Sequence, residues 1–180
     1  KKLENEFYQS KSLNKKIEEL NSQLESKVAV QSKEIKDLID NINTSVFAID
    51  KDFKVTPPVS KYSETIFGED IVGKKVSEFL FSNIRKGTKE HRDLRTIFSI
   101  IFGGDELQFF GIVDNLPEKV TFHDQINHMK KTLKLSYSGL YGQDHLLEKL
   151  ICTAEDVTVS EIHLKKAKED QESYKFISDI

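Results

Sequence analysis

Two short stretches of the chain contain residue types that can act on phosphate groups. Residues 103–106 read Gly-Gly-Asp-Glu. Glycines let a backbone approach a nucleotide closely, and a following carboxylate can help to bind a metal ion. Residues 91–93 read His-Arg-Asp, and a histidine ring can accept a phosphoryl group. Residues 91–110 therefore raise two candidate chemistries, nucleotide cyclisation and phosphoryl transfer.

The first stretch differs by one residue from the Gly-Gly-Asp-Glu-Phe signature of bacterial diguanylate cyclases, because Leu107 takes the last place. In those enzymes the signature lies on a tight turn between two strands. Here the preceding residues 94–102 have the apolar spacing of a helix. The earlier metal-binding aspartate of the cyclases, with Phe-Lys close behind it, has no counterpart in residues 44–100. We therefore interpret Gly103 and Gly104 as a helix stop.

The second stretch is similar to the phospho-acceptor box of sensor histidine kinases. In that box the histidine directly precedes the acidic residue, whereas here Arg92 takes that place. One residue on a helix corresponds to about 100° of rotation, so the ring of His91 would face elsewhere. His91 instead shares a stripe with Leu94, Phe98 and Ile101. We interpret it as a histidine at the edge of a core, and we predict no catalytic residue in the chain.

Composition limits the possible partners and compartments. The 27 basic and 30 acidic residues of the 180 are interspersed and give a net charge of −3, so we expect no nucleic-acid partner. The single cysteine, Cys152, allows no disulfide within the chain and suits a reducing compartment. The sequence has no apolar run of the ~18 residues that a membrane span needs. Its first residues are charged, so we expect no signal peptide. We predict a cytoplasmic chain, or the cytoplasmic part of a membrane-anchored receptor.

Residues 1–43 are predicted to form one long signalling helix, because residues 1–42 contain neither Gly nor Pro. Apolar residues recur every three or four positions, with Gln31 filling one slot: Leu13, Ile17, Leu20, Leu24, Val28, Ile35, Leu38 and Ile42. The spacing is typical of a coiled-coil seam with a stutter near Val28. Because so polar a helix buries little alone, we expect a parallel homodimer through these helices. The alternative is a helix packed on its own domain.

Residues 44–158 are predicted to form one α+β domain. A β-hairpin is expected over residues 45–55, and Thr56-Pro57-Pro58 should break regular structure. Helices are predicted over residues 59–68, 76–81 and 88–102. Candidate strands follow over residues 107–113, 119–126, 131–141 and 146–154. A length of about 110 residues is enough for a single core.

Residues 159–180 are predicted to form an output helix. Its apolar stripe is weaker and consists of Leu164, Ala167, Gln171, Tyr174 and Ile177. Asp156 or Thr158 could cap this helix by accepting hydrogen bonds from its free N–H groups.

The order of these elements resembles a PAS domain of a bacterial signalling protein. The match covers residues 44–158 and consists of three segments: SVFAIDKDFKV, VSKYSETIFGEDIVGKKVSEFLF and Asp156-Val157-Thr158. Residues 85–129 depart from the family pattern. The resemblance implies a five-stranded antiparallel sheet with helices on one face, and an Asp-Val-Thr motif that couples the last strand to an output helix.

The resemblance also defines the candidate sites. Flavin-binding members place a reactive cysteine within Asn-Cys-Arg, and Cys152 lacks those neighbours, so we expect it to be a small buried hydrophobe. Haem-binding members use a helix histidine, for which His91 is the candidate. Phe98 and Tyr137 complete the ligand-binding candidates. A metal pair of His123 and His128 would need carboxylates nearby, and we predict neither a metal nor a cofactor.

The resulting prediction is a dimeric, non-catalytic sensor or relay module of a bacterial signal-transduction protein. It would pass a ligand signal or an upstream helix signal to an output domain of the same protein. We expect Val28, Gln31, Asp156 and Thr158 to transmit that signal. A sensor histidine kinase is the predicted context. The alternatives are a module upstream of a diguanylate cyclase and a purely structural dimerisation scaffold.

Overall fold

The computed structural model describes residues 2–68, 70–123 and 129–178 and divides the chain into two compact units, residues 1–38 and 39–180. The first unit is most of a single helix, α1 (Lys2–Asp40). The predicted seam residues on α1 are 46% to 69% exposed. The long helix is therefore present, and its apolar stripe is exposed. Among the described residues, no helix is long and apolar enough to cross a lipid bilayer.

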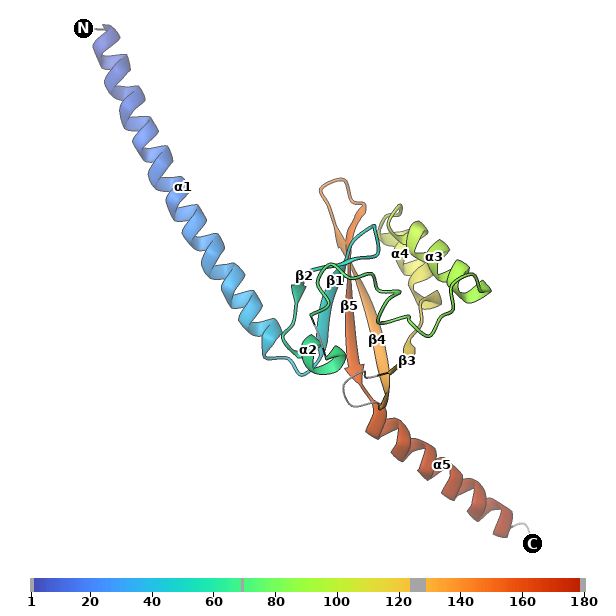
Figure 1. The fold of residues 1–180 in the computed structure, drawn as a ribbon. Helices are drawn as coiled ribbons and strands as arrows, with labels where there is room; N and C mark the ends of the chain where they lie inside the picture. Colours follow the sequence, from blue (N-terminus) through green and yellow to red (C-terminus); the bar gives the residue numbers. More distant parts are fainter. Residues whose placement is uncertain (1, 69, 124–128, 179–180) are drawn as a thin grey trace. The chain divides into compact units, whose positions relative to one another are not determined.

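The second unit is built on an antiparallel sheet of five strands in the order β2-β1-β5-β4-β3 (Figure 1). The strands are β1 (Ser45–Ile49), β2 (Val55–Val59), β3 (Lys119–His123), β4 (Lys130–Tyr141) and β5 (Leu147–Asp156). The predicted α+β class and the five-stranded sheet are confirmed. The central strands are β1 and β5, which pair from Ser45↔Ala154 to Ile49↔Leu150.

One face of the sheet carries the core. Residues directly paired across strands place their side chains on the same face. Phe47 pairs with Cys152, and Cys152 pairs with Tyr137. Phe47, Cys152 and the next inward residue of β5, Leu150, are fully buried. On the opposite face the side chains of β4 are largely exposed. The helices therefore cover a single face, as predicted.

The cover consists of α2 (Tyr62–Phe67), α3 (Lys89–Ile101), α4 (Glu106–Ile112) and a short 3₁₀ turn (Val113–Asn115). Phe67 is central to it, because its ring contacts those of Phe47, Phe79 and Phe122 at centroid distances of 6.0, 4.9 and 5.3 Å. All of these contacts are edge-to-face, the geometry that aromatic rings prefer. An aromatic cluster thus fills the space between the sheet and α2.

Two predicted features of the helices are confirmed: the end of α2 and the buried face of α3. Helix α2 ends at Gly68, which adopts a left-handed conformation (φ 74°) that glycine accommodates without strain. Helix α3 places Leu94, Phe98 and Ile101 in the core, as the stripe in the sequence indicated. The C-terminal helix α5 (Thr158–Ser178) follows β5 directly.

The predicted break at Thr56-Pro57-Pro58 is confirmed in part. These residues lie inside β2, but the register with β1 is interrupted there, because Thr56 pairs with Ala48 and Val59 pairs with Phe47. Proline cannot donate a hydrogen bond to a sheet ladder and is tolerated only at edges. Strand β2 is an edge strand, so the missing donors cost it little.

The predicted helix over residues 76–81 is wrong, because these residues form successive turns.

The predicted strand over residues 107–113 is instead helix α4 and the start of the 3₁₀ turn. The Asp105 side chain accepts a hydrogen bond from the Gln108 backbone N–H at 2.9 Å. The Gln108 side chain accepts one from the Asp105 backbone N–H at 3.2 Å. This reciprocal capping box satisfies two free donors at the helix start. It overrides the strand preference of the aromatic residues that follow.

We predict that Asp105→Ala lowers the free energy of unfolding by about 1 kcal/mol, because the cap of α4 is lost. Chemical denaturation followed by circular dichroism measures this change. Asp93→Ala, which removes an exposed carboxylate from α3, is the matched control and should have little effect. Equal stability of the two variants would contradict the capping role.

Candidate functional site

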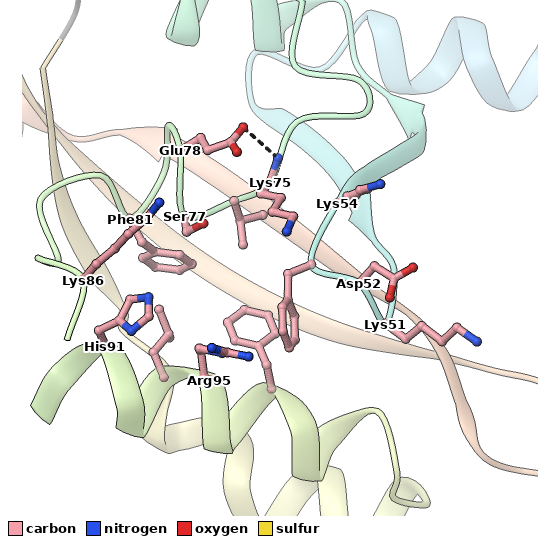
Figure 2. Close-up of a pocket in the computed structure, with 14 residues that line it drawn as sticks. Lys51, Asp52, Lys54, Lys75, Ser77, Glu78, Phe81, Lys86, His91 and Arg95 are labelled. Carbon is pink, nitrogen blue, oxygen red and sulfur yellow. Dashed lines mark hydrogen bonds between the residues drawn. The ribbon is translucent and has the colours of Figure 1, made fainter. Parts of the chain in front are cut away.

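One candidate site is a pocket of about 690 Å³ at the end of the β1–β2 hairpin. Its walls come from three segments: the β1–β2 loop, residues 75–86 and helix α3. Figure 2 shows His91 and Arg95 on α3, on the opposite side of the pocket from Lys75 and Ser77.

The loop wall is fixed by Asp50. One oxygen of its carboxylate accepts hydrogen bonds from the backbone N–H groups of Asp52 and Lys54, at 2.9 and 3.0 Å. The backbone carbonyl of Asp50 accepts a further bond from the N–H of Phe53. These bonds hold Phe53 at φ 61°, a conformation that is uncommon for a residue with a side chain. The ring of Phe53 is thereby directed onto that of Phe98, at a centroid distance of 5.3 Å.

The second wall is hydrogen-bonded to the first. The N–H of Val76 donates to the carbonyl of Phe53, and the N–H of Val55 donates to the carbonyl of Lys74. Between these bonds, Lys54 and Lys75 form an antiparallel bridge. Two lysines therefore lie opposite each other at the pocket.

Helix α3 supplies the third wall. The Thr88 hydroxyl caps its first turn by accepting a hydrogen bond from the His91 N–H at 3.3 Å. The spacing of His91, Leu94, Arg95 and Phe98 places all of them on one face, and all line the pocket. Leu94 and Phe98 are buried, whereas Arg95 is exposed.

The pocket combines an apolar floor with a cationic rim. Five lining side chains are cationic at neutral pH and two are carboxylates: Lys51, Lys54, Lys75, Lys86 and Arg95, against Asp52 and Glu78. The local net charge is +3, whereas the whole chain carries −3. Phe53, Phe81 and Phe98 supply aromatic surface. The arrangement suits non-covalent binding of a negatively charged group.

The three ligand-binding candidates from the sequence do not come together. His91 and Phe98 both line the pocket. Tyr137 lies instead on the core face of β4, where its hydroxyl donates to the carbonyl of Pro117 at 2.9 Å. Burial raises the pKa of the Tyr137 phenol well above its ordinary value. Tyr137 is therefore a hydrogen-bonded core residue.

The other residues considered for chemistry have structural roles. Gly103 and Gly104 connect α3 to α4, not two strands. Cys152 is fully buried, and burial raises the pKa of its thiol, which disfavours the reactive thiolate. His123 is exposed at the end of β3, and His128 lies outside the described residues. Within residues 2–68, 70–123 and 129–178, no cluster of His, Cys, Asp and Glu is suited to a metal ion.

The junction that leads into β1 is held by serine hydroxyls. The Ser45 and Ser63 oxygens lie 2.7 Å apart, and both residues are buried. The Ser60 hydroxyl accepts from the Val46 N–H at 2.9 Å and donates to the Thr44 carbonyl at 3.1 Å. Hydroxyls thus fix the start of β1 against the start of α2.

The junction that leads out of β5 contains the predicted Asp156 and Thr158. The Asp156 carboxylate accepts hydrogen bonds from both the N–H and the hydroxyl of Thr158. The Thr158 hydroxyl also accepts from the N–H of Thr132 on β4, at 2.9 Å. The first residue of α5 is thereby joined to two strands. The other two predicted transmission residues, Val28 and Gln31, are exposed on α1.

Sequence reasoning missed the rim of the pocket. Lys54, Lys75 and Arg95 come from three separate segments and look like ordinary surface charges in the sequence. The sequence did predict the turn around Asp50, because Asp and Asn side chains favour such turns. It gave no indication that the following Phe53 would be directed onto α3.

Comparison with known proteins identifies the fold. No family model matches the chain, and no curated protein matches its sequence. The PAS domain of an HTR-like protein from Haloarcula marismortui matches with a TM-score of 0.51 at 13% identity, covering 75% of this chain and 98% of that chain. An RNA-binding light-oxygen-voltage receptor matches with a TM-score of 0.56 at 10% identity, covering 83% and 39%. The PAS domain of BvgS from Bordetella pertussis gives 0.46 at 15% identity, covering 79% and 98%. The first of these matches shows that the chain has the PAS fold.

We predict that Tyr137→Phe lowers the free energy of unfolding at pH 7 by about 1 kcal/mol, because the Pro117 carbonyl loses its donor. The variant should also reduce the loss of stability above pH 10. The folded wild-type chain keeps the phenol protonated there, whereas the unfolded chain, with a pKa near 10.0, releases the proton.

Denaturation measured from pH 7 to pH 11 tests both effects. Tyr62→Phe, in a half-buried tyrosine of α2, is the control. An alkaline loss of stability that is the same in wild type and in Tyr137→Phe would contradict the assignment of Tyr137 to the core.

Proposed function

We propose that the chain is a non-catalytic, dimeric sensor or relay module of a bacterial signal-transduction protein. In this proposal α1 carries a signal into the sheet and α5 carries it to an output domain of the same protein. The observation that carries the proposal is the pairing of Ser45 with Ala154. Because β1 begins where β5 ends, the chain enters and leaves the sheet on hydrogen-bonded neighbours.

The exposed stripe on α1 supports dimerisation. Its residues recur at coiled-coil spacing, yet they are about half exposed or more. A second copy in parallel register would cover the stripe with an identical stripe, which is the arrangement that a heptad pattern favours. The stutter near Val28 would leave a locally unwound seam with two similar packings. Such a segment can act as a bistable element.

The proposed output is a histidine kinase domain. This step rests on how the fold is used in bacterial sensors, and fold analogy alone is an associational argument. The hydrogen bonds of Asp156, Thr158 and Thr132 support the transmission step. They make the first turn of α5 dependent on the position of β4 and β5.

We predict that the chain is a dimer of twice 20.7 kDa and that Leu24→Lys raises its dissociation constant by at least about tenfold. The substitution would bury a charge in the seam and remove apolar contacts in both copies. Sedimentation equilibrium measures the constant. Ser26→Lys adds the same charge on the other side of α1 and should leave it unchanged. A monomeric wild-type chain, or equal effects of the two substitutions, would contradict the proposed seam.

A further inference from the structure

We propose that the pocket between the β1–β2 loop, residues 75–86 and α3 binds a small organic anion with an aromatic body. Its use as a signal rests on the proposed function, whereas its binding does not. A volume of about 690 Å³ lies within the range of roughly 300–1,000 Å³ that small-molecule sites occupy. Its lining includes no residue of β3, β4 or β5 among the described residues. The site is therefore distinct from the space behind the sheet, which aromatic rings fill.

The charge of the ligand follows from Lys54 and Lys75. They are partners in an antiparallel bridge, and like charges in that position repel. Among the described residues neither ammonium group takes part in a salt bridge. An anion between them would relieve the repulsion and satisfy both donors. The bridge itself is backbone and holds the two lysines together in the absence of any ligand.

Arg95 supplies the third cation. It lies one helical turn after His91 on the pocket face of α3, and Figure 2 shows it on the wall opposite Lys75. A guanidinium presents a planar pair of donors that binds a carboxylate, phosphate or sulfonate through two oxygens. An anionic group held between Arg95 and Lys75 is thus bound from both walls.

The aromatic part of the ligand follows from Phe53 and Phe98. Their rings pack edge to face at 5.3 Å, and the half-buried Phe53 still borders the pocket. The hydrogen bonds of Asp50 hold Phe53 in its uncommon conformation. The apolar surface therefore exists before binding, and a ring placed on it gains stacking contacts without reordering the loop.

Binding would act on β1. The loop of Asp50 to Lys54 continues directly from the last residue of β1, while Ser45 at the other end of β1 pairs with Ala154. A ligand that joins the loop to α3 therefore restrains one end of β1, the strand whose other end pairs with β5.

The test measures binding of two fluorescent probes to the purified chain. Anilinonaphthalene sulfonate is an aromatic anion, and phenylnaphthylamine has the same aromatic body without the sulfonate. We expect the wild-type chain to bind the sulfonate more tightly, by about tenfold or more, since a charge-assisted contact is lost in the neutral probe. Added salt should reduce this preference. Equal affinity of the wild-type chain for the two probes would by itself overturn the proposal.

The pocket variant Lys75→Gln with Arg95→Gln should weaken sulfonate binding by about tenfold or more. The matched control, Lys61→Gln with Lys89→Gln, removes two exposed cations outside the pocket and should bind as the wild type does. Equal affinity of the two variants would overturn the proposal. Sedimentation of the same samples reports dimerisation separately, so a failure of the pocket is distinguishable from a failure of the relay.

Discussion

The pairing of β1 with β5 is the interaction on which the rest of the structure depends. Both strands lie in the middle of the sheet, and Phe47, Ile49 and Cys152 on their inner face are fully buried. Interiors packed to this density deform little, so a displacement of one strand is transmitted to its neighbour. Because the strands are antiparallel, the start of β1 and the end of β5 lie together. The chain therefore passes from α1 into the middle of the sheet and leaves the middle of the sheet into α5.

The two ends of this strand pair are held by hydrogen bonds, whereas the core is held by apolar packing. Hydroxyl groups of Ser60 and Thr158 fix the two junctions, and each such hydrogen bond contributes only about 1 kcal/mol of net stability. At the other end of β1, the hydrogen bonds of Asp50 fix the pocket loop. A closely packed strand pair whose ends are held by a few hydrogen bonds is suited to relaying a displacement. The aromatic cluster around Phe67 fills the space between the sheet and α2.

Much of the fold follows from local sequence patterns, and the exceptions have identifiable causes. The helical stripe of α3, the glycine stop of α2 and the buried Cys152 each depend on a residue's own neighbours. Strand β2 continues past its prolines because it lies at the edge of the sheet and its register shifts there, and a sequence displays neither strand order nor register. Helix α4 was missed because the capping box of Asp105 outweighs a β-rich composition. The pocket was missed because the fold, not the spacing, brings its cations together. Of the predicted site residues, His91 and Phe98 reach it.

Amide hydrogen exchange at the β5–α5 junction tests most directly whether α1 is coupled to α5. Deleting residues 25–28 converts the seam to uninterrupted coiled-coil spacing, whereas deleting residues 14–20 shortens α1 by one heptad and keeps the stutter. The account predicts that the first deletion changes the exchange rates of the Thr132, Val157 and Thr158 amides, which are bonded at that junction. The second deletion should leave them as in the wild type. Unchanged rates after the first deletion, in a variant that sediments as a dimer, would contradict the proposed relay.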